Sequence, residues 1–378
     1  MKEMKRAETR CGYIFILEIM VLAFLMLVSI AGATPFAYIT NYGNDDVSEI
    51  DTVSVIDTAT NTFITTIDVG RGPTGVAITP DGSKVYVLNS FDSTVSVIDT
   101  TTNKVIATVD VENGPIGVAV SPDGTKVYVT QCRDEDGNTA ISIIDTAKNK
   151  VTDTINIGHY DSLGDIAVTP DGKRVYVLAE GGPTSVIDTA TNTIIATVNV
   201  GSYPGGIVIT PDGKKAYVAN GYNNVSVIDT ATNIVVATVS DRIGSVSGIA
   251  VAPNGSKVYV ANYGYGANNI YDGGGNISVI DTLTNKVTVM VPLGKYTYGV
   301  AITPDGTKLY VANDYSNVSV IDTSTNKVTS TVNIGTRHLG IAIGNKKVQN
   351  VSHTTPSEFN SLLVVILILY IWRKSTKI

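Results

Sequence analysis

Three histidines could carry acid–base or metal chemistry, and they lie far apart in the sequence: His159, His338 and His353. None stands in an H-x-H or H-E-x-x-H arrangement, which would place two imidazoles on one metal ion. The sequence also has no G-x-S-x-G nucleophile motif and no glycine-rich phosphate loop. We therefore expect no catalytic residue, no metal site and no cofactor.

The acidic segment 134–138, which reads D-E-D-G-N, looks like part of a calcium loop. The register of such a loop would put Cys132 at the first ligand position and Ile143 at the last, and neither side chain binds calcium. We interpret the segment as a solvated acidic loop.

Tyrosine is the residue type that points to binding. A tyrosine ring combines a flat apolar face with a hydrogen-bonding hydroxyl and loses little entropy when a partner orders it, which suits protein or glycan contacts. The alternative is that these rings only pack loops onto strand ends. Ten of the 19 tyrosines fall in the variable segments that connect the repeated strands: Tyr42, Tyr160, Tyr203, Tyr222, Tyr263, Tyr265, Tyr271, Tyr296, Tyr298 and Tyr315.

The elements that must position these side chains are repeats. The string S-[VI]-I-D-T begins at Ser54, Ser96, Ser142, Ser185, Ser226, Ser278 and Ser319. Its aspartates are 41 to 52 residues apart. A period in the low forties, carried by β-rich segments, indicates a repeat architecture such as a propeller.

The second repeat contains four predicted strands, A (75–79), B (85–89), C (95–99) and D (105–111). Strands A to C are almost continuously apolar, which is typical of strands covered on both faces, whereas strand D is more polar. An orphan A strand at 340–343 can complete the first blade and remove the open edges. We predict an all-β fold, a seven-bladed β-propeller of four-stranded antiparallel blades, closed by the C-terminal strand joining the first blade.

The conserved-looking polar positions of the repeat are expected to build turns. A P-D-G or P-N-G sequence separates strands A and B, and an asparagine follows each S-[VI]-I-D-T aspartate by four residues. Asparagine tolerates the left-handed backbone of a tight hairpin, and aspartate bonds nearby amides. The expected turn residues are Asp57, Asp99, Asp145, Asp188, Asp229, Asp281 and Asp322, with Asn61, Asn103, Asn149, Asn192, Asn233, Asn285 and Asn326.

The two ends of the predicted blades differ in what they present. The A–B and C–D turns lie at one end, the turn face, and are nearly the same in every repeat. The B–C and D–A loops lie at the other end, the loop face, and they vary in length and content, so function is expected there. The loop face carries the ten tyrosines, together with Arg337 and His338.

The B strands read Y-I-T-N, Y-V-L-N, Y-V-T-Q, Y-V-L-A and three times Y-V-A-N. With G-V-A-I-T-P-D-G and S-V-I-D-T-x-T-N, residues 36–345 resemble the YVTN family of β-propellers, and within it the surface-layer-type proteins of methanogenic archaea. The resemblance implies a cell-surface propeller of structural or adhesive role. Some relatives resemble lactonases or quinoprotein-associated propellers.

Both ends of the chain differ from the repeats, which occupy 34–345. Residues 1–33 have a basic start, an apolar run and an A-G-A ending, which indicates a signal peptide, with an uncleaved membrane anchor as the alternative. A polar linker, 346–361, leads to the hydrophobic tail 362–378, which we interpret as a sorting signal or membrane anchor. The P-S-E-F sequence at Pro356–Phe359 resembles the archaeal PEF sorting signal but contains an inserted serine.

The charge and the export prediction limit the partners. The two ends hold seven basic and four acidic side chains, so the remaining chain keeps 20 basic side chains of 27 and 30 acidic ones of 34. An acidic domain argues against nucleic acid as a partner. Only Cys132 lies outside the predicted leader. Among the N-x-[ST] sequences of an exported protein, Asn254 and Asn350 are the better candidates for glycosylation, because turn chemistry explains those at Asn224, Asn276 and Asn317.

The sequence therefore predicts a non-enzymatic surface-layer or adhesion propeller, exported to the cell surface. It would contact envelope proteins or glycans through the loop face and a membrane only through its terminal segments. The alternative is an enzyme of the lactonase-like or quinoprotein-associated kind, suggested by fold analogy. Its candidate groups are His159, Arg337 and His338, expected near the mouth of the central channel.

Overall fold

A computed structural model of the chain describes residues 35–42, 51–221, 223–263, 274–294, 296–313, 317–335 and 337–345. The predicted signal peptide, polar linker and hydrophobic tail lie outside these residues. Within the described part, no helix is long and apolar enough to cross a membrane.

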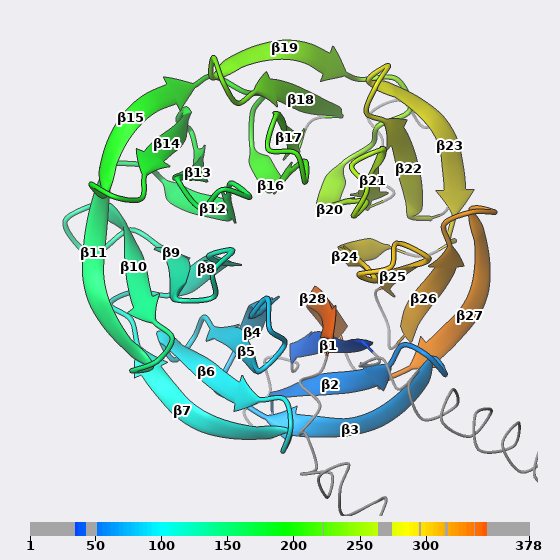
Figure 1. The fold of residues 1–378 in the computed structure, drawn as a ribbon, viewed down its shortest axis with the longest axis horizontal. Coiled ribbons are helices and arrows are strands. Elements are labelled where there is room, and N and C mark those ends of the chain that lie inside the picture. The colour runs from blue at the N-terminus through cyan, green and yellow to red at the C-terminus, as the bar shows by residue number, and fades with distance from the viewer. Residues whose placement is uncertain are drawn as a thin grey trace, which may run out of the picture. The chain divides into compact units, whose positions relative to one another are not determined.

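The described strands form seven four-stranded antiparallel sheets arranged around a central channel (Figure 1). Each sheet is a blade, and its strands are named here from the innermost to the outermost. They are, in blade 1, β28 (Arg337–Asn345), β1 (Pro35–Tyr42), β2 (Thr52–Asp57) and β3 (Thr62–Asp68); in blade 2, β4 (Pro73–Ile78), β5 (Lys84–Asn89), β6 (Thr94–Asp99) and β7 (Lys104–Asp110); in blade 3, β8 (Pro115–Val120), β9 (Lys126–Gln131), β10 (Thr139–Asp145) and β11 (Lys150–Gly158); in blade 4, β12 (Ser162–Val168), β13 (Arg174–Glu180), β14 (Thr184–Asp188) and β15 (Thr193–Val198); in blade 5, β16 (Pro204–Ile209), β17 (Lys215–Asn220), β18 (Asn224–Asp229) and β19 (Ile234–Val239); in blade 6, β20 (Val246–Val251), β21 (Lys257–Asn262), β22 (Asn276–Asp281) and β23 (Lys286–Pro292); in blade 7, β24 (Thr297–Ile302), β25 (Lys308–Asn313), β26 (Asn317–Asp322) and β27 (Lys327–Asn333).

The closure of the ring is confirmed. The C-terminal strand β28 pairs antiparallel with β1, with Ala37 opposite Ile343 and Ile39 opposite Ile341. Strand β28 therefore supplies the innermost strand of blade 1, and the first and last repeats share one sheet. Every blade therefore has a neighbouring blade on both sides, and the ring has no open end.

The burial of each strand follows the predicted order of the repeat. In blade 2, every residue of β5 after Lys84 is buried, whereas most residues of the outermost strand β7 are exposed. Buried aliphatic side chains of adjacent blades form shared clusters, as where Val95 and Val97 of blade 2 pack with Val127 and Val129 of blade 3. The hydrophobic core is therefore a series of layers between blades, which explains the nearly continuous apolar runs of the inner strands. The predicted strand ends differ from the observed ones by up to three residues, as at the start of β28.

The repeated aspartate and asparagine build turns, as the sequence predicts. Asp281 is typical, because its Oδ1 accepts a hydrogen bond from the Thr284 amide at 2.8 Å. Asn285 of the same turn has φ 52°, and all seven asparagines at this position lie in the left-handed region. Asn285 also accepts a hydrogen bond at 2.8 Å from the Tyr217 hydroxyl of the preceding blade, so the turn joins blades as well as strands.

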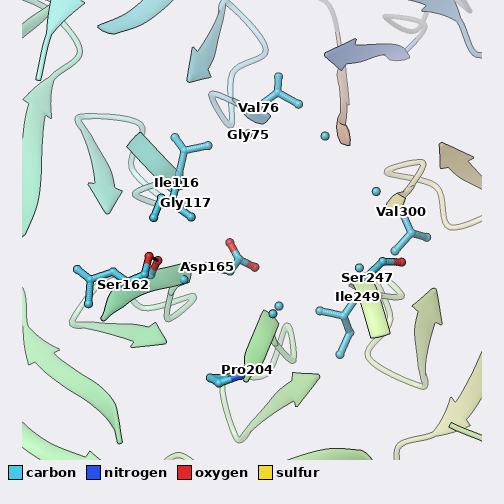
Figure 2. Close-up of a pocket in the computed structure, with 18 of the residues that line it drawn as sticks. Gly75, Val76, Ile116, Gly117, Ser162, Asp165, Pro204, Ser247, Ile249 and Val300 are labelled. Atoms are coloured by element: carbon cyan, nitrogen blue, oxygen red, sulfur yellow. Dashed lines mark hydrogen bonds between the residues drawn. The ribbon is translucent and has the colours of Figure 1, made fainter. Parts of the chain in front are cut away.

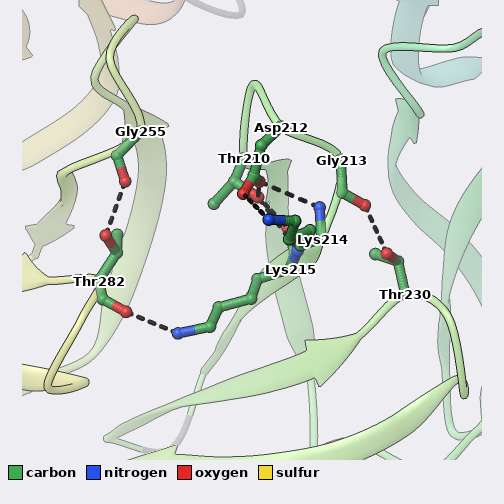
Figure 3. A network of polar contacts seen from close by, with 8 residues as sticks. All are labelled: Thr210, Asp212, Gly213, Lys214, Lys215, Thr230, Gly255 and Thr282. Atoms are coloured by element: carbon green, nitrogen blue, oxygen red, sulfur yellow. Dashed lines mark hydrogen bonds and ion pairs between the residues drawn. The ribbon is translucent and has the colours of Figure 1, made fainter.

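A second set of contacts between blades runs through lysine and threonine, as Figure 3 shows for blades 5 and 6. Lys215 Nζ donates a hydrogen bond to the Thr282 carbonyl at 2.6 Å, and the Thr282 hydroxyl donates to the Gly255 carbonyl at 2.7 Å. The lysine that opens the second strand of a blade and the threonine that ends S-[VI]-I-D-T therefore have structural roles. Their repetition carries no functional information.

Candidate functional site

Three of the predicted tyrosines come together on the loop face between blades 6 and 7. The rings of Tyr263 and Tyr296 are stacked, with centroids 4.7 Å apart and planes at 15°. The ring of Tyr298 stands edge-on to Tyr263 at 5.3 Å, and the two hydroxyl oxygens are 3.2 Å apart. We call these three residues the tyrosine cluster.

The backbone around the tyrosine cluster is fixed by buried hydrogen bonds. The Thr297 hydroxyl donates to the Asn262 carbonyl at 2.9 Å, which ties the start of β24 to the end of β21. The Ser247 hydroxyl donates to the Thr297 carbonyl at 2.6 Å from β20. Each cluster tyrosine is half-buried, so one part of each ring packs while the rest faces solvent. Rings held in this way form a preorganised surface that loses little entropy when a partner binds.

The other predicted tyrosines do not share one role. Tyr160 packs against the core of blades 3 and 4, and a Cβ placed on Gly182 would lie 2.3 Å from its ring. The packing interpretation therefore holds for Tyr160. Tyr203 is 53% exposed and lines two cavities. Tyr222, Tyr265, Tyr271 and Tyr315 lie outside the described residues, and for Arg337 and His338 only the backbone of β28 is described.

A further aromatic pair lies on the loop face between blades 1 and 2. Tyr42 meets Phe91 edge-to-face, with centroids 5.6 Å apart, and Phe91 is 58% exposed. Beside it, Arg71 donates to Asp92 from both its backbone amide, at 2.8 Å, and its Nε, at 2.7 Å. These hydrogen bonds hold the pKa of Asp92 below its ordinary value. Tyr42 is one of the ten predicted tyrosines, whereas Phe91 was not predicted as part of this surface.

The glycosylation candidates are separated by burial. Asn254 is exposed in a turn at the turn face, where its Oδ1 accepts hydrogen bonds from the amide and hydroxyl of Ser256. Asn276 and Asn317 are buried first residues of third strands, and each accepts a hydrogen bond from the asparagine opposite. They are the first residues of strands rather than the last residues of the preceding turns, so the expectation that turn chemistry explains them is wrong. Asn350 lies outside the described residues.

The acidic segment forms a closed local turn. Asp134 accepts a hydrogen bond from the Asn138 amide at 2.8 Å, and this contact is the main cause that lowers the pKa of Asp134. Across the described residues, no group of three histidine, cysteine or acidic side chains is close enough to hold a metal ion. Cys132 beside this turn is exposed and unpaired.

The central channel contains a cavity of about 510 Å³ lined by the innermost strands of the blades (Figure 2). Branched aliphatic side chains and glycines make up most of its wall, and Asp165 of β12 projects toward its centre. A second cavity of about 450 Å³ lies beside it at the loop face and shares Glu180, Tyr203 and Pro204 with it. His159 is exposed and does not line either cavity.

Asp165 is the charged residue that sequence reasoning missed. Its Oδ2 accepts a hydrogen bond from the Ile207 amide of blade 5 at 3.0 Å. The residue is partly exposed to the channel, and burial by the surrounding strands raises its pKa to about 6. The signal was present, because the G-V-A-I-T-P motif reads D-I-A-V-T-P in this repeat alone.

The seven blades and the central channel define the class, since the chain is a seven-bladed β-propeller protein. A family described as YNCE-like beta-propeller matches residues 23–136. The predicted relation to a β-propeller family is thereby confirmed in this coarser form, and the archaeal surface-layer type and the PEF-like tail stay predictions. No curated protein sequence matches the chain.

Two solved structures are similar to the chain in fold. One is hydrazine synthase from Kuenenia stuttgartiensis, which is 22% identical with a TM-score of 0.61, over 73% of this chain and 96% of that chain. The other is a functionally unknown protein from Desulfotomaculum acetoxidans DSM 771, which is 20% identical with a TM-score of 0.68, over 82% of this chain and 99% of that chain. At these identities the similarity shows the fold alone.

Proposed function

We propose that the chain is a non-enzymatic binding propeller of the cell surface, which contacts envelope proteins or glycans through its loop face. The observation that carries this proposal is the tyrosine cluster, in which Tyr263, Tyr296 and Tyr298 are stacked or edge-on to one another on a fixed backbone. Aromatic rings with one apolar face and one hydrogen-bonding end are typical of such contact surfaces.

The distribution of repeated and varied residues supports the same face. At the turn face, the repeated aspartates and asparagines are used within the turns and between blades, as Asp281 and Asn285 are. At the loop face, the exposed aromatics Phe91 and Tyr203 are specific to single blades. A partner that recognises this protein rather than any propeller must read residues that differ between blades.

The test is binding of the labelled full chain to isolated cell envelopes, with and without Tyr263→Ala and Tyr298→Ala. Loss of a central aromatic contact costs an interface about 2 kcal/mol or more, so we expect at least a roughly tenfold loss of affinity. Phe63→Ala is the matched control, because Phe63 is 43% exposed on the outermost strand β3, away from the loop face. Protease and periodate treatment of the envelopes distinguish a protein partner from a glycan. Equal binding by all variants would remove the proposed surface.

The export part of the proposal rests on residues 1–33 and 346–378, whose sequences carry the leader and tail patterns. The intact mass of the native protein, purified from membranes, reports both cleavages and any glycan on Asn254 or Asn350. A mass equal to that of the full sequence would contradict processing at both ends.

A further inference from the structure

One position of the repeat faces the channel in all seven blades and differs in a single blade. In blade 4 this position is Asp165, five residues before Pro170 of the A–B turn. The other six blades have glycine there, at Gly75, Gly117, Gly206, Gly248, Gly299 and Gly340. Blade 4 therefore replaces one member of a glycine ring with a carboxylate.

The glycine ring has a packing cause. A Cβ on Gly248 would lie 2.5 Å from the Tyr298 carbonyl oxygen, and a Cβ on Gly299 would lie 2.5 Å from that of Leu339. Both contacts are with the backbone of the next blade, which cannot move aside as a flexible side chain would. The fold itself favours glycine at this position, so the side chain of Asp165 needs another explanation.

Blade 5 makes room for Asp165. The residue facing it is Gly206, and a Cβ built there would lie 3.9 Å from Oδ2 of Asp165. The Ile207 amide then holds Oδ2 of Asp165 at 3.0 Å and orients the carboxylate. Gly206 and the Ile207 amide together position this side chain over the channel.

The Asp165 carboxylate faces the cavity, and no cation among the described residues pairs with it. None of the ion pairs formed by the described residues includes Asp165. The wall around it carries Val76, Ile116, Ile249 and Val300, which offer apolar contact but no countercharge (Figure 2). With a pKa raised to about 6 by burial, the group is ionised at neutral pH. An ionised carboxylate against apolar walls is stabilised by any cation that enters.

We propose that the central cavity binds a small organic cation, an amine or guanidinium group on an apolar body, through the carboxylate of Asp165. The volume of about 510 Å³ lies within the usual range of small-molecule sites and far exceeds a metal ion. A calcium or magnesium ion also needs several oxygen ligands, and one carboxylate does not supply them. The aliphatic wall fits the apolar body, and Asp165 fits the charged head.

The opening that leads to the cavity is also lined by acidic side chains. The adjoining cavity at the loop face is lined by Asp161 and Glu180, and it meets the channel at Glu180 and Tyr203. Asp161 lies 3.8 Å from Arg133, an exposed pair that solvent screens. Acidic walls raise the local concentration of cations and repel anions, so this opening favours the proposed ligand.

Binding should follow the protonation of Asp165. The flanking strands β8 and β16 carry no ionisable side chain. On β13, Arg174 donates to the Thr230 carbonyl of the neighbouring blade and Tyr176 donates to Asn233, while Glu180 lines the cavity. Affinity for a cation should therefore be full above about pH 7 and fall as the pH passes below about 6.

The experiment measures binding of phenethylamine and of its neutral analogue 2-phenylethanol to the full chain, by calorimetry and by amide NMR shifts. We expect the amine to bind at least about tenfold more tightly than the alcohol, because a charge-assisted hydrogen bond adds that much. Asp165→Asn should remove this preference, while Glu180→Gln should retain most of it. The amide shifts should centre on Gly206 and Ile207.

Three outcomes would overturn the proposal: no amine binding up to about 10 mM, which is weaker than any specific site; equal binding of amine and alcohol; or unchanged amine binding by Asp165→Asn. Circular dichroism of the Asp165→Asn variant reports whether it is folded, and Asp165→Gly offers a second variant that restores the residue of the other six blades. The tyrosine cluster is not needed for this site, so Tyr263→Ala should bind the amine as the unchanged chain does.

Discussion

The carboxylate of Asp165 should reduce the stability of the propeller at neutral pH, and Asp165→Asn should restore it. Burial raises the pKa of Asp165 from 3.8 to about 6 in the folded chain. A group whose pKa is higher in the folded state binds its proton more tightly there, so folding is favoured when the group is protonated. Its effect on stability is therefore neutral below about pH 4 and unfavourable above about pH 6.

The size of the effect follows from the shift. A displacement of about two pKa units corresponds to about 3 kcal/mol between the two protonation states. The side chain is partly exposed to the channel, so solvent screens part of this energy and the figure is an upper limit. We expect Asp165→Asn to raise the free energy of unfolding at pH 7.5 by about 1–3 kcal/mol and to leave it nearly unchanged at pH 4. Asparagine keeps the carbonyl oxygen that accepts from the Ile207 amide.

The assay is chemical unfolding followed by circular dichroism at several values between pH 4 and pH 8, and the quantity compared is the difference between variant and unchanged chain. Carboxylates such as Asp92 and Asp123 have lowered pKa values, so the stability that they contribute is lost only as the pH falls below about 4. They occur in both proteins and cancel in the difference. Asp68→Asn, at an exposed end of the outer strand β3, is the matched control.

Two results would refute the reasoning. The first is a stability difference between Asp165→Asn and the unchanged chain that does not vary with pH, because the effect would then have no connection with ionisation. The second is a variant that is less stable at pH 7.5, because the carboxylate would then be stabilised by a partner in the folded chain.

Two further predictions concern the repeat. Gly248→Ala should lower the free energy of unfolding by about 2 kcal/mol or more, because its Cβ would lie 2.5 Å from a backbone oxygen. Gly205→Ala has 4.0 Å of space and should change that free energy by less than about 0.5 kcal/mol, so equal losses in the two variants would contradict the close approach of the blades. Ser226→Ala should lower the free energy of unfolding by about 1–2 kcal/mol, because the Ser226 hydroxyl accepts a hydrogen bond from the Asn220 side chain at 3.0 Å. Ser185→Ala should leave it unchanged, since the buried Ser185 hydroxyl has no hydrogen-bond partner. Thermal unfolding measures both variants, and a large loss of stability in Ser185→Ala would contradict this reasoning.

The fold could be predicted because the signal repeats seven times. The apolar strand runs, the P-D-G turns and the asparagine of the C–D turn each recur, and a feature such as the left-handed Asn285 depends only on its local sequence. The orphan first and last strands fixed the closure through β28 and β1. Boundaries were wrong by up to three residues because ladder pairing, rather than residue type, decides where a strand ends.

The candidate site could be predicted only in part, since sites depend on contacts between blades. The face was predictable from loop variation, but the meeting of Tyr263 with Tyr298 requires two segments 35 residues apart to be adjacent in space. Tyr160 shows the opposite case, because its ring packs against Gly182 and contributes to the core. Asp165 was overlooked because the repeat was used to identify shared residues, and the informative residue was the one that departed from the repeat.

Two departures from the repeat lie in the same blade, and this coincidence supports the channel as a site. Blade 4 has Asp165 in place of glycine, and it has Ala179 where six other blades have asparagine or glutamine. The second change leaves the Ser185 hydroxyl buried without a hydrogen-bond partner. In other blades the equivalent serine accepts a hydrogen bond from the amide side chain that Ala179 replaces, as Ser226 does from Asn220. Each change lowers the stability of the fold relative to the residue that the other six blades have at the same position. Sequences that retain such local costs do so mainly at functional sites, and both cavities of the loop face and channel border this blade.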